Sequence, residues 1–145
     1  MPAFAHTVAA GIVIAAGVYL IALAAVALAR PALARRFLLG FAQTAAVHYT
    51  EMAGRILVGF ALLVASPRML FSHFFFWFGV ALMASSVLLL CLPWKWHRSM
   101  GERVLPKFAS FLGIVSFVSL LLGGLLVTAT VAAPSNISLE GTREG

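Results

Sequence analysis

The chain has 145 residues, of which 63% are hydrophobic and only 10% are charged, and its mean hydropathy is +1.06. A soluble domain has about one quarter charged residues, because water must solvate its surface. This composition therefore excludes a soluble domain and predicts a membrane protein. The formal net charge of +6 comes from Lys and Arg clusters between apolar runs, a pattern typical of membrane topology rather than of nucleic-acid binding.

Three apolar runs are long enough to cross a bilayer as helices, since a hydrocarbon core of about 30 Å needs about 20 helical residues. The first run, 8–29, has no Lys or Arg before it and is followed by Arg30, Arg35 and Arg36. This order favours an uncleaved span over a signal peptide. The runs 69–92 and 108–132 are also uncharged, and each predicts a span.

The second span is harder to place, because its uninterrupted apolar run, 56–65, reaches only about 15 Å as a helix. A crossing of about 20 residues that ends at Ser66 must begin near Val47. We therefore predict a span over 45–66 that carries Glu51 and Arg55 into the membrane. The preceding segment, 37–46, either continues the same helix or lies along the membrane interface.

Basic residues predict the orientation of the spans. With the first connection in the cytoplasm, the non-cytoplasmic side holds only Arg68 and Arg143, so both termini lie outside. The basic residues of the cytoplasmic side are then Arg30, Arg35, Arg36, Lys95, Arg98, Arg103 and Lys107. The predicted fold is an all-α, antiparallel four-helix transmembrane bundle, one domain over 1–133, with a mobile polar tail over 134–145. The Ala- and Arg-rich, Lys-poor composition favours a bacterial inner-membrane protein.

Polar side chains share one face of the second span. At 100° per residue, Thr44, His48, Glu51, Arg55 and Gly59 fall within an arc of about 80°. Ionisable groups within a membrane usually face a bundle interior or a water-filled cavity, which favours a small oligomeric transporter or channel that uses this stripe. In the structural alternative, Arg55 extends toward the cytoplasmic edge and forms a solvated cluster with Glu51 and His48 that attracts anionic headgroups.

Two further patterns concern the surface of the bundle. The cluster after the third span is typical of anchoring to anionic headgroups on the cytoplasmic side; it also offers a site where a membrane enzyme would hold a lipid or quinone. Its residues are Trp94, Lys95, Trp96, His97 and Arg98. Small residues at Gly113, Ser116, Ser119 and Gly123 favour close helix packing. They pack either against the Gly11 and Ala15 face of the first span or against another subunit.

No cofactor is predicted, although two alternatives exist. His48 is the histidine placed to ligate a b-type haem within the bundle, and the Phe-rich stretch 71–78 offers an aromatic lining for a quinone. The second reading competes with an ordinary lipid-facing aromatic belt. The sequence contains no glycine-rich phosphate loop, CxxC or HExxH motif, so neither a catalytic residue nor a metal ligand is predicted.

The leading hypothesis is a non-catalytic accessory, assembly or scaffolding subunit of a larger membrane complex. Its basis is the absence of a nucleophile–base pair from the sequence, the small extramembrane mass and the helix faces suited to docking. The expected partners are the lipid bilayer and other membrane subunits or further copies of the chain, with no nucleic acid. The alternatives are a small oligomeric transporter or channel and a haem- or quinone-binding redox subunit.

Overall fold

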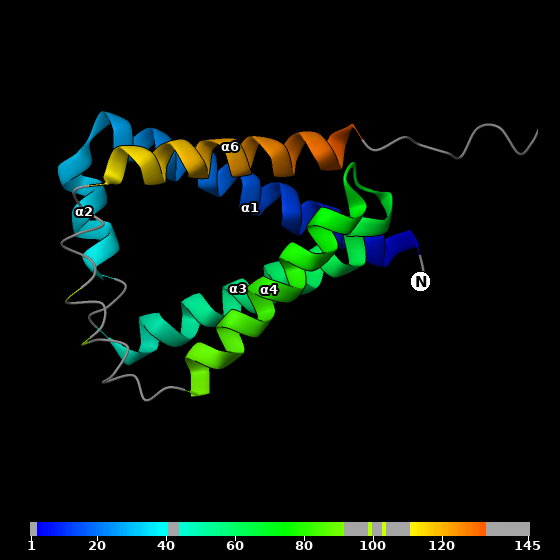
Figure 1. Ribbon diagram of the computed structural model, residues 1–145, viewed down its shortest axis with the longest axis horizontal. Helices are drawn as coiled ribbons and strands as arrows, with labels where there is room; N and C mark the ends of the chain where they lie inside the picture. The colour runs from blue at the N-terminus through cyan, green and yellow to red at the C-terminus, as the bar shows by residue number, and fades with distance from the viewer. Residues whose placement is uncertain (1–2, 41–43, 92–98, 100–102, 104–110, 133–145) are drawn as a thin grey trace, which may run out of the picture.

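The computed structural model describes residues 3–40, 44–91, 99, 103 and 111–132 (Figure 1). Within these residues all regular secondary structure is helical. The elements are α1 (Ala3–Ala29), α2 (Pro31–Gly40), α3 (Ala45–Ala65), the 3-10 turn η1 (Ser66–Arg68), α4 (Ser72–Cys91) and α6 (Leu112–Val131). By length and composition, α1, α3 with η1, α4 and α6 can each cross a membrane. The prediction of an all-helical chain with four such helices is confirmed, and it indicates an integral membrane protein.

The observed helix bounds differ from the predicted ones at two ends. Helix α1 begins at Ala3, before the predicted start at 8, and α4 begins at Ser72 rather than at 69. Pro67 occupies the first turn of η1, and Phe71 adopts a left-handed conformation with φ 59°. Apolar residues 69–71 therefore form a turn instead of the first turn of α4. The tail 134–145, residue 92 and residues 108–110 lie outside the described part of the chain.

The segment before the second span is a separate helix. Residues Phe37 to Gly40 belong to α2, and Thr44 is extended, with φ −130° and ψ 147°. The Thr44 hydroxyl accepts a hydrogen bond from the Val47 backbone N–H at 3.3 Å, so Thr44 is the N-cap of α3. Residues 37–40 therefore do not continue the second span, and α3 begins at Ala45, two residues before the start near Val47 that length predicts.

Glycines at close contacts organise the four long helices into two pairs, α1 with α6 and α3 with α4. A Cβ added to Gly123 would lie 2.6 Å from the Gly17 carbonyl oxygen, and one added to Gly79 would lie 2.8 Å from the Gly59 carbonyl oxygen. Both distances are shorter than real Cβ contacts. Only glycine allows the backbones of each pair to approach this closely.

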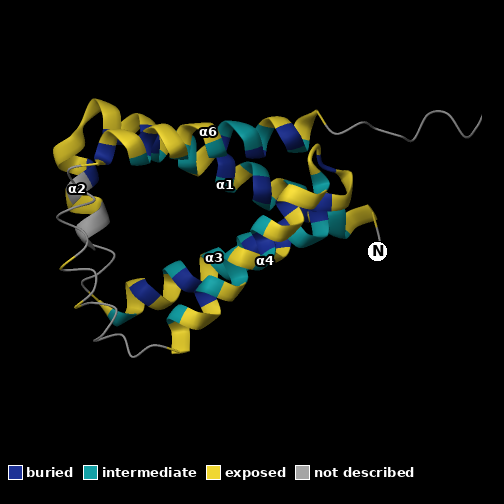
Figure 2. Cartoon of the chain, viewed as in Figure 1, coloured by how far each residue is buried: buried dark blue, intermediate teal, exposed yellow. Residues whose placement is uncertain are grey.

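The two pairs share a hydrophobic core at one end of the molecule, which we call the joined end. Its buried members come from the first half of α1, the second half of α3, the turn before α4, the start of α4 and the second half of α6 (Figure 2). They are Ala9, Val13, Ala61, Leu62, Ala65, Met69, Phe75, Leu126 and Ala129. The Leu70 N–H also donates to the Ala129 carbonyl at 3.1 Å, which ties the α3–α4 turn to the end of α6.

The opposite end, which we call the open end, is built differently. Helix α2 lies there between the two pairs, and the ribbons of α1 and α3 diverge toward it (Figure 1). The core cluster there joins Ala27 and Leu112 of the α1–α6 pair to Ala34 of α2. Met52 and Ser86 are fully buried near this end, yet neither belongs to the core shared by the two pairs. Each pair therefore packs mainly within itself at the open end.

Candidate functional site

The polar stripe predicted on the second span is divided among different environments. Thr44 is exposed and serves as the cap of α3, and His48 is buried with 3% of its surface exposed. The His48 ring lies 5.5 Å from the Tyr49 ring, measured between centroids. Glu51 and Arg55 are the partly exposed members, and Gly59 contacts α4. The four polar residues share a helix face, and Glu51 and Arg55 form an ion pair on it.

Glu51 and Arg55 form an ion pair along α3, with Arg55 Nη1 at 3.8 Å from Glu51 Oε1. The charge-assisted hydrogen bonds that stabilise ion pairs most strongly have N–O distances of about 2.7 to 2.9 Å. The observed contact is longer, so it is electrostatic without being a direct hydrogen bond. The Arg55 and Glu51 side chains keep 34% and 32% of their surface exposed. Both therefore have hydrogen-bonding capacity available to another group.

Tyr19 of α1 is a member of this site that sequence reasoning missed. Helix α1 packs against α3, and Tyr19 lies as far from the open end of α1 as Arg55 does from the start of α3. Tyr19 keeps 50% of its surface exposed. We call Tyr19, Glu51 and Arg55 the polar trio. A tyrosine in an uncharged run has no distinctive signal in the sequence, because its neighbour on another helix depends on the tertiary packing.

The polar trio lies at a similar depth on both helices. Arg55 follows the first residue of α3 by ten positions, and Tyr19 precedes the last residue of α1 by the same number. At 1.5 Å per residue each lies about 15 Å from the open end of its helix, which is half of a hydrocarbon core of about 30 Å. Long side chains on a helix point toward its N-terminus, so the Arg55 guanidinium is directed toward the level of Glu51.

Histidines are divided between the two ends of the molecule. His48 is near the start of α3 at the open end, whereas His6 and His73 are near the starts of α1 and α4 at the joined end. Residue His97 lies outside the described part of the chain. Among the described residues, no group of three or more His, Cys, Asp or Glu side chains is placed to hold a metal. The haem alternative through His48 stays a prediction.

The small-residue stripe of the fourth span faces more than one direction. Gly123 packs against Gly17 and Ile21 of α1, and Ser116 is buried with its hydroxyl donating to the Leu112 carbonyl at 2.7 Å. Ser119 is half-buried. A Cβ added to Gly113 would meet nothing within 4 Å in the described chain.

The partner surface on the first span differs from the expectation. Gly11 faces open space among the described residues, and Ala15 is exposed. Gly17 makes the close contact with α6 instead. Packing of α6 against the Gly11 and Ala15 face was therefore the wrong expectation, because the register of two apolar helices is decided by their combined shape rather than by one small-xxx-small spacing.

Two other candidate regions add little to the site. The cluster formed by Trp94, Lys95, Trp96, His97 and Arg98 lies outside the described residues. The Phe-rich stretch is split: Phe75 is fully buried in the shared core, whereas Phe71, Phe74, Phe76 and Trp77 are exposed. Phe74 and Phe78 stack with their centroids 6.1 Å apart. The exposed rings are placed as a lipid-facing belt would be.

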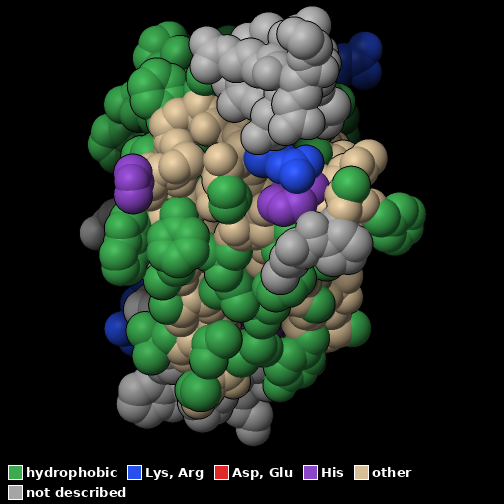
Figure 3. All heavy atoms as spheres, turned by 90° about the vertical axis from the view of Figure 1, so that its right-hand side faces the viewer, with side chains coloured by type: hydrophobic (Ala, Val, Ile, Leu, Met, Phe, Trp, Pro, Cys, Tyr) green, Lys and Arg blue, Asp and Glu red, His purple; other side chains and the backbone are tan. Residues whose placement is uncertain are grey.

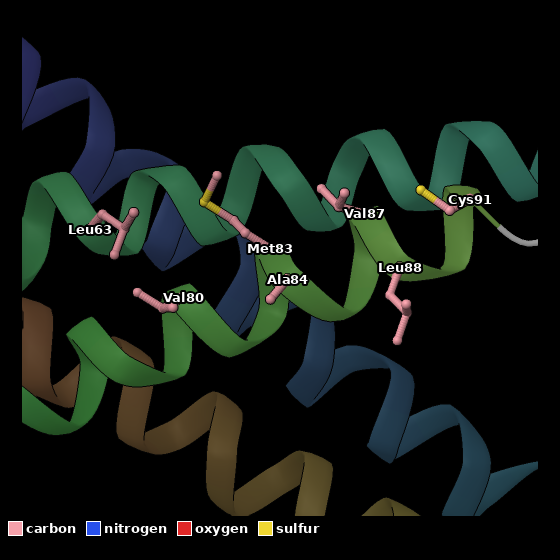
Figure 4. Close-up of a pocket in the computed structure, with 7 residues that line it drawn as sticks. All are labelled: Leu63, Val80, Met83, Ala84, Val87, Leu88 and Cys91. Carbon is pink, nitrogen blue, oxygen red and sulfur yellow. The ribbon is translucent and has the colours of Figure 1, made fainter.

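A groove of about 580 Å³ runs along α4. Its lining is apolar apart from the Cys91 thiol, and it consists of Leu63, Val80, Met83, Ala84, Val87, Leu88 and Cys91 (Figure 4). A ligand site usually contains a few polar groups that fix the orientation of the ligand. This groove has no such group among its lining residues, so it is a surface suited to lipid tails and is separate from the polar trio.

The end face of the molecule on the joined side is mainly hydrophobic (Figure 3). A few Lys or Arg and His side chains break this surface, and no acidic side chain of the described residues is visible on it (Figure 3).

Comparison with protein-family models, with curated proteins and with solved structures finds no match to the chain. The functional argument therefore depends on the residues themselves.

Proposed function

We propose that the chain is a non-catalytic membrane subunit that holds a transmembrane helix of a partner protein between its two helix pairs. The observation that carries the proposal is the confinement of the shared core to the joined end. Beyond that core, α1 carries Tyr19 and α3 carries Glu51 and Arg55, side chains that keep about a third to a half of their surface exposed. A helix inserted there would bury these side chains and complete the packing.

The cost of charge within a membrane supports this reading. Ionisable side chains in membrane spans face protein interiors or water-filled cavities, because exposure to hydrocarbon is costly. Glu51 and Arg55 lie on the inward side of α3 but retain one third of their surface. A docked helix would exclude lipid from the pair, and a polar side chain on that helix would satisfy it.

The orientation in the proposal follows from the basic residues. Arg30 and Arg36 are exposed at the open end, and Arg68 is at the joined end. With the basic connections in the cytoplasm, the spans alternate in direction and both termini lie on the non-cytoplasmic side. The open end then faces the cytoplasm, where anionic headgroups attract its arginines. We retain the bacterial inner membrane as the proposed location.

Photo-cross-linking in native membranes tests this role. Positions 16, 19 and 23 share one face of α1, since residues three and four apart are helical neighbours, whereas 18, 22 and 25 lie on the opposite side and are exposed. A photoreactive phenylalanine analogue is introduced at each of the six positions. The proposal expects one and the same protein adduct from the first set, with lipid adducts from the second.

The cross-linked protein must then behave as a partner subunit of the chain. Mass spectrometry should find the cross-linked protein in complexes purified gently without cross-linking, and its deletion should lower the level of the chain. Equal adducts from both faces, or a monomer without protein adducts at 16, 19 and 23, would contradict the proposal. The first result would show that α1 does not present one particular face to a partner, and the second that this face meets lipid.

A second candidate function is a small transporter, favoured by the Glu51–Arg55 ion pair within a helix that can span a membrane. Polar groups from both pairs at mid-membrane depth offer a path for a proton, with Arg55 as a counter-ion. Proteoliposomes containing the purified chain test it. Proton flux that Glu51→Gln abolishes and Arg68→Met leaves intact would favour transport over docking.

A further inference from the structure

We propose that the groove along α4 binds one acyl chain of a phospholipid from the leaflet at the open end. The groove has a volume of about 580 Å³, and Leu63 of α3 contributes to its lining (Figure 4). The proposal rests on the construction, depth, lining and width of this groove. It does not depend on a docked partner helix.

One face of α4 builds most of the groove. Val80, Ala84, Leu88 and Cys91 follow one another at helical spacing, so they lie in a row along the helix. Ala84 has the smallest side chain of the row, which leaves a hollow between the larger Val80 and Leu88. Val80 and Leu63 are half-buried, whereas Ala84, Leu88 and Cys91 are exposed. The groove is therefore deepest at Val80 and opens toward Cys91.

The groove has the depth of one leaflet. Val80 lies 11 residues before Cys91, the last residue of α4, so the groove extends about 17 Å along the helix. Half of a hydrocarbon core of about 30 Å is about 15 Å. Cys91 is at the open end (Figure 1). An acyl chain that enters from the interface beside Cys91 therefore places its terminal methyl near Val80, at the middle of the membrane.

The lining of the groove excludes water as its occupant. Buried water needs two to four polar partners, and the lining is apolar apart from the Cys91 thiol. An empty groove would leave its lining side chains without dispersion contacts on one side. Lipid tails are as apolar as a leucine side chain, so a flexible acyl chain can fill the groove without any polar group.

The width of the groove favours an acyl chain over a protein helix. About 580 Å³ spread over about 17 Å gives a mean cross-section of about 35 Å². A helix with side chains is at least about 10 Å in diameter, which corresponds to about 80 Å². A helix could therefore insert only a row of side chains, whereas a polymethylene chain can lie in the groove along its whole length.

Photoreactive lipids test the proposal with the full chain in phosphatidylcholine liposomes. The distal probe is a phosphatidylcholine with a diazirine at the end of its palmitoyl chain, and the proximal probe carries the diazirine beside the ester. Mass spectrometry quantifies adducts on Leu63 in the groove and on Leu57, a leucine of the same helix that lies outside the groove and is 54% exposed.

The distal probe should label Leu63 at least as strongly as Leu57, although Leu63 is less exposed. The proximal probe should instead label Leu88 or Cys91. Ala84→Leu should lower distal labelling of Leu63 by at least about threefold, because close-packed groups cannot share the added volume, and should leave Leu57 unchanged.

The matched control is Ala22→Leu. Ala22 is exposed and lies seven residues before the end of α1, as Ala84 does before the end of α4. This variant adds the same volume at the same depth outside the groove, so both labelling levels should stay as in the unmodified chain.

Several results would overturn the proposal. Stronger distal labelling of Leu57 than of Leu63 would show ordinary lipid contact that follows exposure. Labelling of Leu63 by the proximal probe would show that the chain enters from the opposite leaflet. Unchanged labelling in Ala84→Leu would place the lipid outside the groove, and absence of adducts on Leu63 would show that lipid does not enter it. None of these results bears on the α1 cross-linking pattern, which tests the proposed docking role separately.

Discussion

Replacing Gly123 with alanine should separate α1 from α6, whereas the same change at the neighbouring Gly124 should not. A Cβ at position 123 would lie 2.6 Å from the Gly17 carbonyl oxygen and 2.9 Å from Ile21 Cγ1. Ordinary van der Waals contact begins at 3.4 Å, so the first distance is too short by 0.8 Å. The nearest obstacle is backbone, which no rotamer change can remove.

The magnitude follows from two opposing effects. Overpacking a tight contact costs about 1 to 3 kcal/mol, because the helices must move apart and lose dispersion contacts. Alanine in place of glycine favours the helix by about 1 kcal/mol. Gly123→Ala should therefore lower the free energy of unfolding by about 0 to 2 kcal/mol. A Cβ at Gly124 meets nothing within 4 Å in the described chain, so Gly124→Ala should raise it by up to about 1 kcal/mol.

The difference between the two variants is the quantity to measure, since the helix preference of alanine is common to both. Unfolding in mixed micelles with increasing SDS, followed by circular dichroism, gives the two free energies of unfolding. The predicted difference is about 1 to 3 kcal/mol in favour of Gly124→Ala. Equal midpoints for the two variants would refute the close α1–α6 contact on which the description of the helix pairs depends.

Three further predictions concern the site and the joined end. Arg55→Met should destabilise the chain by about 1 to 2 kcal/mol in the same assay. This loss is smaller than for a fully buried pair, because both side chains are partly exposed. The double variant Glu51→Gln with Arg55→Met should restore most of the lost stability, and an additive loss would contradict the pairing. Leu62→Ala, at a fully buried core position, should cost about 2 to 5 kcal/mol, whereas Leu57→Ala at an exposed position should cost about 0.5 kcal/mol or less. Phe71→Gly should stabilise the turn by about 0.5 to 1 kcal/mol, because φ is 59° there and the ring is 69% exposed. A lower SDS midpoint would show that the contacts of the ring stabilise the chain by more than the backbone strain destabilises it.

Much of the fold could be predicted because helix length and bilayer thickness are linked. The distance that a helix ending near Ser66 must cover predicts a start near Val47, within two residues of the observed start at Ala45. The same reasoning placed Glu51 and Arg55 within the span. The start of α4 was misplaced since residues 69–71 are apolar, and hydropathy does not distinguish a buried turn residue such as Met69 from a helical one.

The pairing of the helices could not be predicted in the same way. Gly17, Gly59 and Gly79 decide which backbones approach each other, yet each is one glycine in an apolar run. The sequence places Gly59 on the polar stripe, and its partner on α4, Gly79, is not part of a distinctive spacing of small residues. Tyr19 was missed for a related reason, because the packing of α1 against α3 cannot be read from either helix alone.

The central claim is that the two helix pairs are joined at one end and separate at the other. Double electron–electron resonance in liposomes measures this directly, with spin labels on paired cysteines in a Cys91→Ser background. Val26 with Val47 reports the open end, and Val8 with Phe60 reports the joined end; all four side chains are exposed. The account predicts a clearly longer distance for the open-end pair than for the joined-end pair. Equally short distances for both pairs, as in a bundle with helix axes about 8 to 10 Å apart throughout, would contradict it.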